Sequence, residues 1–249
     1  MRPLLHPTPS SGLKRRPQRL LMMDLKNIKA VIIDFDGTLY DSKGFTKKFL
    51  KTLGFSSLLK ARNERKLRSL YKGKYFGTGE EFYFSYFQEL ARLCHVSPQK
   101  ISDWYFKKYM KAMTETLRKY FTCRPGTEKL FAFFKEKNIK TAVFSDYGFV
   151  PQRMKAIGLE GASDFLFSAE ILGGLKPACE PFFKIARVLG EKPENILVIG
   201  DRPDTDGRGA LNSCMKSLIV KTEKNSKQNL ENIFTWEEIL SMIFSETGL

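Results

Sequence analysis

From Pro125 onward, stretches with helical apolar spacing alternate with short apolar runs that are typical of buried strands. This alternation is the pattern that builds a parallel sheet with helices on its two faces. Another apolar run, at residues 30–33, supplies a first strand far upstream and brings the predicted core strands to five. Helices are predicted at 127–137, 150–157, 181–189, 206–212 and 236–244, and the later strands at 141–144, 164–167, 196–199 and 217–220. The sequence thus predicts an α/β fold with a doubly wound parallel sheet.

Residues 42–122 interrupt this alternation and are predicted to be helical. Apolar and aromatic side chains recur there at helical spacing, as at Phe82 and Tyr86, and such stripes are typical of a buried helix face. We therefore expect a small helical bundle inserted into an α/β core that consists of residues 26–41 and 123–249. A chain of 249 residues is long enough for a medium domain with such an insert.

The first 25 residues differ in composition from the rest of the chain. They contain four prolines and the basic string KRR at 14–16, which predicts a disordered basic tail. The apolar stretch and small-residue cleavage site of a secretory signal are missing, so export is not expected. Met22 and Met23 directly precede the folded part, which suggests that translation begins there in the native protein.

The formal net charge of +15 is concentrated in two parts of the chain. Residues 1–29 carry seven Lys or Arg against one acid, and residues 42–122 carry 18 against six, whereas residues 123–249 balance at 17 each. A basic surface beside an active site raises the local concentration of anionic substrates, but the same residues could also be solvated helix faces without a partner. Charge alone permits nucleic-acid binding. Because the chain shows no recognition motif for it, we do not expect a nucleic-acid partner.

Cysteine usage and hydropathy narrow the class of protein. The four cysteines lie far apart without a Cys-x-x-Cys pair, and the chain has only two histidines, so a zinc site is disfavoured and a reduced, cytoplasmic protein is expected. No stretch approaches the roughly 20 apolar residues that span a bilayer, and no membrane association is expected. The oligomeric state has no signature in the sequence.

The string DFDGTL at 34–39 directly follows the first apolar run and places two carboxylates where a buried strand ends. In open α/β sheets ligands bind outside such strand ends. Because side chains alternate along an extended chain, Asp34 and Asp36 can share one face while Phe35 turns the other way. Two carboxylates at such short range repel each other unless a cation lies between them or one of them stays protonated. The pair therefore predicts a site of chemistry.

Three further stretches follow this string along the chain: KTAVFSD at 140–146, GLKP at 174–177 and ILVIGDRPDTD at 196–206. In this order, the four stretches resemble the four motifs of the haloacid dehalogenase (HAD) superfamily, and the resemblance covers residues 28–220. It implies a Rossmann-like core in which the helical insert is a cap that closes over the mouth of the sheet. Residues 37–44 and 122–126 would be the two linkers about which the cap moves.

Within this superfamily the resemblance implies a phosphatase that works through an aspartyl-phosphate. Asp34 would be the nucleophile that attacks phosphorus. Asp36 would protonate the leaving alkoxide and later deprotonate the attacking water. Charge on the phosphoryl group would be stabilised by fixed donors. These donors would be the Ser145 hydroxyl, the Lys176 ammonium and the backbone N–H groups of Phe35 and Asp146.

The resemblance also implies Mg²⁺, a cation that prefers oxygen ligands. Asp34 and Asp201 would supply side-chain oxygens, and Asp36 would supply its backbone carbonyl. Asp206 would lie behind these ligands and orient either a metal-bound water or Lys176. The rivals for that position are Asp204 and Asp146.

Several alternatives within and outside the superfamily remain open at this point. The acid at position 36 argues against the dehalogenase branch, which lacks it and uses no metal. A sugar phosphomutase shares all four motifs and differs only in its cap, and phosphonate cleavage through a cap lysine is a further possibility. A protein of another class would bind acidic partners or nucleic acid through its basic cap without catalysis. We expect a small phosphorylated metabolite as substrate, selected by cap side chains such as Lys43, Lys47, Arg68, Lys72 and Lys74.

Overall fold

The computed structural model describes residues 27–223, 225–226, 228 and 232–246, so the predicted disorder of residues 1–25 falls outside the described part of the chain. Its centre is a six-stranded sheet in the order β3-β2-β1-β4-β5-β6, in which every strand pair is parallel. The strands are β1 (Ala30–Asp34), β2 (Lys140–Ser145), β3 (Phe165–Ser168), β4 (Ile196–Gly200), β5 (Lys216–Val220) and β6 (Ile233–Phe234). The predicted α/β fold with a doubly wound parallel sheet is confirmed.

The strand order reverses at β1. The chain builds β2 and β3 on one side of this strand and then β4, β5 and β6 on the other. In register, Asp34 lies beside Phe144 of β2, and Ile33 lies between Val143 of β2 and Ile199 of β4. The carboxyl ends of three strands therefore meet around Asp34. Ligands of doubly wound folds bind at such a switch point.

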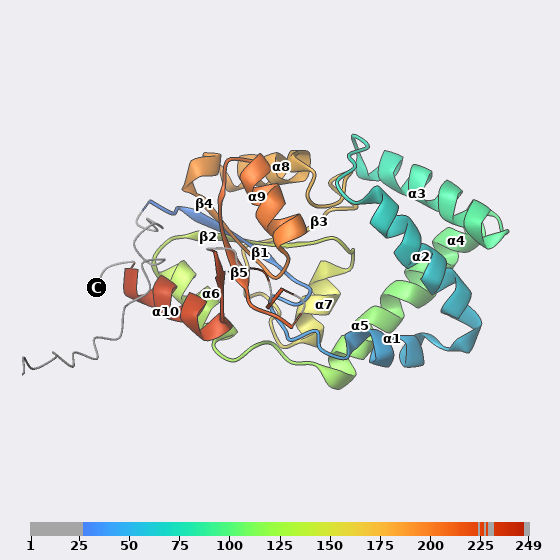
Figure 1. Ribbon diagram of the computed structural model, residues 1–249, viewed down its shortest axis with the longest axis horizontal. Helices are drawn as coiled ribbons and strands as arrows, with labels where there is room; N and C mark the ends of the chain where they lie inside the picture. Colours follow the sequence, from blue (N-terminus) through green and yellow to red (C-terminus); the bar gives the residue numbers. More distant parts are fainter. Residues whose placement is uncertain (1–26, 224, 227, 229–231, 247–249) are drawn as a thin grey trace, which may run out of the picture.

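Helices cover both faces of the sheet (Figure 1). One face carries α6 (Thr127–Glu136), α7 (Val150–Ala156) and α10 (Trp236–Glu246), and the other carries α8 (Cys179–Leu189) and α9 (Arg208–Asn212). Side chains of β1 alternate between the two layers: Val31 and Ile33 belong to the cluster around α6, α7 and α10, and Ala30 and Ile32 to the cluster around α8. All five residues of β1 are buried, because a parallel strand in this fold is covered on both sides.

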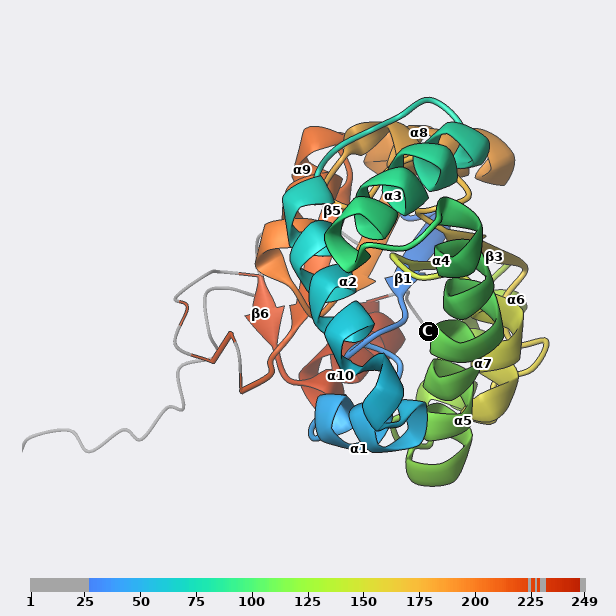
Figure 2. The same ribbon diagram turned by 90° about the vertical axis from the view of Figure 1, so that its right-hand side faces the viewer.

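Between β1 and α6 the chain forms an inserted helical region. Its elements are α1 (Phe45–Leu53), a 3₁₀ turn (Phe55–Ser57), α2 (Leu58–Tyr71), α3 (Gly79–Cys94), α4 (Pro98–Trp104), a π-helical turn (Tyr105–Tyr109) and α5 (Met110–Tyr120). The region lies at the carboxyl end of β1, to the right of the sheet in Figure 1, and faces the viewer in Figure 2. Phe82, Tyr86 and Tyr105 are fully buried inside it, in line with the predicted aromatic stripe.

A third link, besides the predicted linkers at 37–44 and 122–126, joins the inserted helical region to the core. Residues 72–76, after α2, run beside residues 173–176, and we call this pair of segments the clasp. Three backbone hydrogen bonds join them: Gly73 N donates to Lys176 O (3.3 Å), Leu175 N to Lys74 O (3.1 Å) and Phe76 N to Gly173 O (2.7 Å). The clasp therefore connects the inserted region to the loop that carries Lys176.

Most predicted elements differ from the structure by one or two residues at an end, and two differences are larger. The structure adds β6, which was not predicted because its two residues are far shorter than a recognisable apolar run; β6 exists through its pairing with Ile219 and Val220 of β5. The helix predicted at 206–212 begins at Arg208, because residues 203–207 form a separate π-helical turn (Pro203–Gly207). Among the described residues, no helix combines the length and the apolar character that a membrane crossing requires.

Candidate active site

Lys176 and Asp34 form the buried centre of the site. Asp34 is the last residue of β1, and its Oδ1 lies 2.5 Å from Lys176 Nζ. The same ammonium donates to Asp206 Oδ1 at 2.7 Å and to the backbone oxygen of Phe144 at 3.0 Å. The other oxygen of Asp34 accepts a hydrogen bond from Thr38 Oγ1 at 2.8 Å. Both predicted residues thus have fixed positions at the strand switch.

Three buried carboxylates lie close together at this point. Asp34, Asp201 and Asp206 each place one oxygen within 4.8 Å of the others. Gly37 lets the first motif approach Asp201, because a Cβ there would lie 2.2 Å from an Asp201 oxygen. Asp206, expected behind the metal ligands, brings an oxygen into the same cluster and also contacts Lys176.

The charge of this cluster fits a divalent cation. Three carboxylates lie close together here in a buried place, and the ammonium of Lys176 contacts those of Asp34 and Asp206. Burial raises the pKa of Asp34 well above its usual range, and the neighbouring carboxylates of Asp206 and Asp201 raise it further, whereas Lys176 lowers it. Oxygen donors with excess negative charge suit Mg²⁺. The residues that would hold the ion are Asp34, Asp201 and Asp206.

Asp36 has a different partner from Asp34. Arg153 of α7 places Nη2 2.5 Å from both Asp36 oxygens, and Tyr40 donates its hydroxyl proton to Asp36 Oδ1 at 2.9 Å. Burial alone would raise the pKa of Asp36, but the charge and hydrogen bonds of Arg153 outweigh burial and hold this pKa below its usual value. The two acids of the first motif therefore lie in opposite electrostatic surroundings.

The hydroxyl of Ser145 joins Asp36 to the end of β2. Its oxygen accepts hydrogen bonds from Arg153 Nη1 (2.9 Å) and from the backbone N–H of Tyr147 (3.1 Å). It donates its one proton to Asp36 Oδ2 at 3.0 Å. Ser145 was predicted to donate to a phosphate oxygen, so in this arrangement that donation requires the proton to turn away from Asp36.

The other predicted phosphate residues flank these groups. Asp146 follows Ser145 and accepts a hydrogen bond from the backbone N–H of Lys176 at 3.0 Å, and burial raises its pKa. Phe35 is fully buried, and its backbone oxygen accepts a hydrogen bond from Leu39 N at 3.1 Å. Asp204, a rival for the place of Asp206, is half exposed and pairs with Lys72 and Arg202, outside the carboxylate cluster.

Arg68 alone among the five predicted cap cations contacts the second motif, within the contacts of the described residues. Its Nη1 donates to the backbone oxygen of Asp146 at 3.1 Å, and its guanidinium lies 3.9 Å from the ring centroid of Tyr147. Two buried acids neutralise it, Glu64 at 2.8 Å and Glu170 at 2.6 Å. The other four lie elsewhere: Lys43 pairs with Glu223, Lys72 with Asp204, Lys74 lies over the Tyr71 ring, and Lys47 is exposed.

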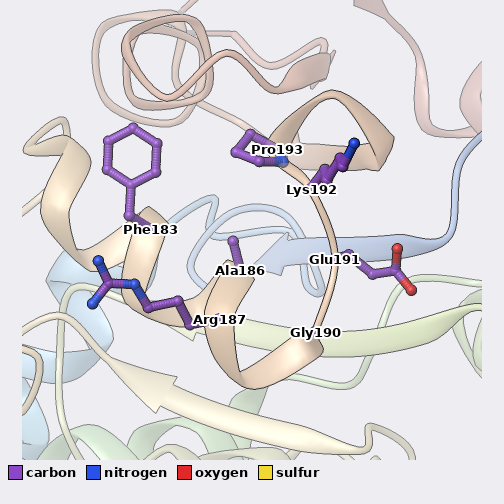
Figure 3. Close-up of a pocket in the computed structure, with 7 residues that line it drawn as sticks. All are labelled: Phe183, Ala186, Arg187, Gly190, Glu191, Lys192 and Pro193. Atoms are coloured by element: carbon purple, nitrogen blue, oxygen red, sulfur yellow. The ribbon is translucent and has the colours of Figure 1, made fainter.

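A surface hollow of about 450 Å³ lies away from these acids. Phe183, Ala186 and Arg187 of α8 line it together with the turn at 190–193 (Figure 3). That turn leads into the amino end of β4, so the hollow is at the opposite end of the strands from Asp34. The hollow is therefore separate from the candidate active site.

Two buried ionic residues of this region carry no signal in the sequence pattern. Arg153 lies in a short helical stretch and Glu170 in a loop, and both are fully buried. Glu170 accepts hydrogen bonds from Arg68, from the Tyr83 hydroxyl (2.9 Å) and from the backbone N–H of Gly148 (3.0 Å). A single charged residue has no periodicity, so only the tertiary contacts reveal these two.

Comparison with known proteins places this site in a family. The family model for haloacid dehalogenase-like hydrolases matches residues 28–213. The phosphoglycolate phosphatase of Aquifex aeolicus is 27% identical over 180 residues, which cover 70% of this chain and 76% of the relative. The glyceraldehyde 3-phosphate phosphatase of Pyrococcus furiosus is 24% identical over 216 residues, covering 83% and 86%.

Solved structures agree on the fold. The crystal structure of CbbY from Rhodobacter sphaeroides in complex with phosphate superposes with a TM-score of 0.61 at 19% identity, covering 83% of this chain and 93% of that one. The family match extends over most of the chain and includes all four motifs. The predicted superfamily is confirmed, and this chain belongs to the haloacid dehalogenase-like hydrolases.

Proposed function

We propose that this protein is a Mg²⁺-dependent phosphatase that hydrolyses a small phosphomonoester through an aspartyl-phosphate on Asp34. The contact of Lys176 Nζ with Asp34 Oδ1, inside a buried cluster of carboxylates at the end of the central strand, supports the proposal most strongly. This contact brings the proposed nucleophile next to a fixed positive charge. Two relatives with phosphatase names support the same reaction class.

In the first half of the reaction an oxygen of Asp34 attacks phosphorus. The bond between phosphorus and the ester oxygen breaks, and Asp36 gives that oxygen its proton, so the alcohol leaves neutral. In the second half water attacks the phosphorus of the aspartyl-phosphate, and Asp36 takes the proton of the water. The bond to Asp34 breaks, and inorganic phosphate and the free carboxylate are restored.

Fixed donors stabilise the charge that develops on the phosphoryl oxygens. Lys176 already contacts the nucleophile and is 2% exposed, so its charge acts in a dry place where electrostatic stabilisation is strong. Ser145 and the backbone N–H groups of Phe35 and Asp146 would contact the same oxygens. Bound between Asp34, Asp201 and Asp206, Mg²⁺ would supply positive charge to the phosphoryl group.

The inserted helical region is proposed to be the cap that selects the substrate. It faces the carboxyl end of the sheet, and its Arg68 reaches the backbone of Asp146. Because Arg68 is already paired with Glu64 and Glu170, it is placed to shape the site rather than to offer a free charge. The clasp keeps the cap next to the loop of Lys176.

Phosphate release from a panel of phosphomonoesters, measured with Mg²⁺ and again with EDTA, tests this function. The panel includes 2-phosphoglycolate and glyceraldehyde 3-phosphate, because relatives are named for them. We expect release that requires Mg²⁺ and disappears in Asp34→Asn. The matched control is Asp41→Asn, an exposed acid a few residues along the same loop, which should keep wild-type activity.

The contrary results are equally specific. No release from any ester by folded wild-type protein would contradict the phosphatase. Transfer of the phosphoryl group between positions of one sugar phosphate, without release, would identify a mutase instead. Unchanged activity in Asp34→Asn would remove Asp34 as the nucleophile.

A further inference from the structure

Arg153 is a fully buried arginine whose guanidinium contacts two residues of the proposed reaction. Its Nη2 lies 2.5 Å from both oxygens of Asp36, and its Nη1 donates to Ser145 Oγ at 2.9 Å. Because the guanidinium is planar and rigid, one group fixes the position of both partners. Asp36 lies in the turn after β1 and Ser145 at the end of β2, 109 residues apart in the chain.

Residues of the core fix the position of the Arg153 guanidinium. Its guanidinium lies 4.2 Å from the ring centroid of Phe35, the residue between the two acids of the first motif. Its Nη1 also lies 3.4 Å from the backbone oxygens of Tyr147 and Gly148. Within the described part of the chain its Nε is buried without a hydrogen-bond partner. The donors that face Asp36 and Ser145 are thus satisfied, while the one that faces away is not.

The side chain of Asp36 depends more on a fixed hydrogen-bond partner than that of Asp34, because it is more exposed to solvent. The Asp36 side chain is 29% exposed, against 8% for that of Asp34. Without Arg153, and among the side chains of the described residues, the Asp36 carboxylate would keep hydrogen bonds from Tyr40 and Ser145, and solvent would compete for it. A proton donor must stay within hydrogen-bond reach of the leaving oxygen to be effective.

We infer that Arg153 is a positioning residue, which aligns Asp36 and Ser145 for proton transfer and phosphate binding; the inference rests on the proposed phosphatase function. A protonated Asp36 can still accept from Arg153 through one oxygen while it donates from the other. On loss of that proton, the carboxylate returns to the arrangement seen here. Arg153 thus acts through Asp36 and Ser145, whose side chains it contacts, and it is assigned no contact with the phosphoryl group.

Leaving-group dependence separates this role from a merely structural one. p-Nitrophenolate is weakly basic and leaves with little help from an acid, whereas an alkoxide requires its proton. If Asp36 loses its alignment, hydrolysis of alkyl esters should therefore slow more than hydrolysis of p-nitrophenyl phosphate. Damage to Asp34, Lys176 or the metal site would slow both esters alike.

The experiment measures kcat/KM for p-nitrophenyl phosphate and for the alkyl ester of the panel that the wild type hydrolyses fastest. In Arg153→Met we expect kcat/KM for the alkyl ester to fall about tenfold or more further than kcat/KM for the aryl ester. A positioned acid contributes about 10²-fold or more to the rate. Arg153→Lys keeps the charge but cannot reach both partners as a fork, so an intermediate ratio is expected. The control is Arg92→Met, because Arg92 forms an exposed pair with Glu89. This variant should leave kcat/KM unchanged for both esters.

An equal loss for both esters, or no loss, would overturn the inference while leaving the phosphatase intact. If Arg153→Met does not fold, Arg153→Lys decides alone, and an unchanged ratio in that variant overturns the inference. Absence of turnover in the wild type would instead contradict the proposed function itself.

Discussion

Lys176 Nζ lies 2.5 Å from Asp34 Oδ1, although 142 residues separate the two in the chain. The ammonium lies 2.7 Å from Asp206 Oδ1 as well. It is therefore the cation that the fold itself brings to the proposed nucleophile. A preorganised charge of this kind acts without reorganisation during the reaction.

Removing this charge should reduce turnover strongly. We expect Lys176→Ala to lower kcat by about 10²-fold or more, in line with the loss of one preorganised donor. Steady-state phosphate release measures the effect, and Lys155→Ala is the control, because Lys155 forms an exposed pair with Glu160. A loss of less than about tenfold would assign Lys176 a structural role.

The metal-free protein should become more stable when Asp34 loses its charge. The pKa of Asp34 is higher in the folded protein than the ordinary value of about 3.9. Between these two values the folded state binds more protons than the unfolded state, so stability falls as pH rises. In EDTA at pH 7, Asp34→Asn should therefore have a higher Tm than wild type, and the difference should disappear below about pH 4.

Thermal denaturation with added Mg²⁺ completes that test. The ion should raise the Tm of the wild type more than that of Asp34→Asn, because it binds the folded state through the lost carboxylate. Asp41→Asn, at an exposed loop position, should follow the wild type. An equal or lower Tm of Asp34→Asn in EDTA would contradict the raised pKa of Asp34 in the folded protein.

The clasp should be sensitive to a single methyl group at Gly173. A Cβ there would lie 2.7 Å from the backbone oxygen of Gly77, and the residue has φ of +87°. Gly158 has nearly the same φ, +86°, but open space around it, so Gly158→Ala reports backbone strain alone. We expect urea denaturation to show Gly173→Ala less stable than Gly158→Ala. Equal stabilities of the two variants would mean that the clasp accommodates the methyl group without loss of stability.

Glu170 should be necessary for the contact between the inserted helical region and the core. It is fully buried and pairs with Arg68 at 2.6 Å. Breaking a buried pair by removing one partner costs about 3–5 kcal/mol, and we expect Glu170→Gln to lose free energy of unfolding at the lower end of that range, because the amide still accepts hydrogen bonds. Glu160→Gln, at an exposed pair, is the control. A loss equal to that of the control would contradict a role for Glu170 in this contact.

The sequence predicted most of the sheet because its central strands are apolar on both faces. Residues 30–33 and 196–199 read as uninterrupted apolar runs, which is the pattern of a strand covered by helices on two sides. The structure extends each run by one residue, to Asp34 and Gly200. The strand β6 has only two residues, which is too short to show such a pattern, and its position depends on pairing with β5.

The candidate site was predictable to the extent that its residues follow strands. Asp34, Ser145 and Asp201 come directly at or after strand ends, where a linear motif carries the information. Arg153 and Glu170 could not be found this way, because their partners lie far away in the sequence. Asp36 and Arg153 are 117 residues apart, and only the fold shows that they meet.

We expect Asp34 to carry the phosphoryl group during turnover. The most direct measurement is an acid quench of wild-type protein during hydrolysis of a radiolabelled phosphomonoester with Mg²⁺, followed by peptide mapping. We predict label on the peptide that contains Asp34 and none on the corresponding peptide of Asp34→Asn. Label on another residue, or an active wild-type enzyme that never becomes labelled, would rule out Asp34 as the carrier of the phosphoryl group.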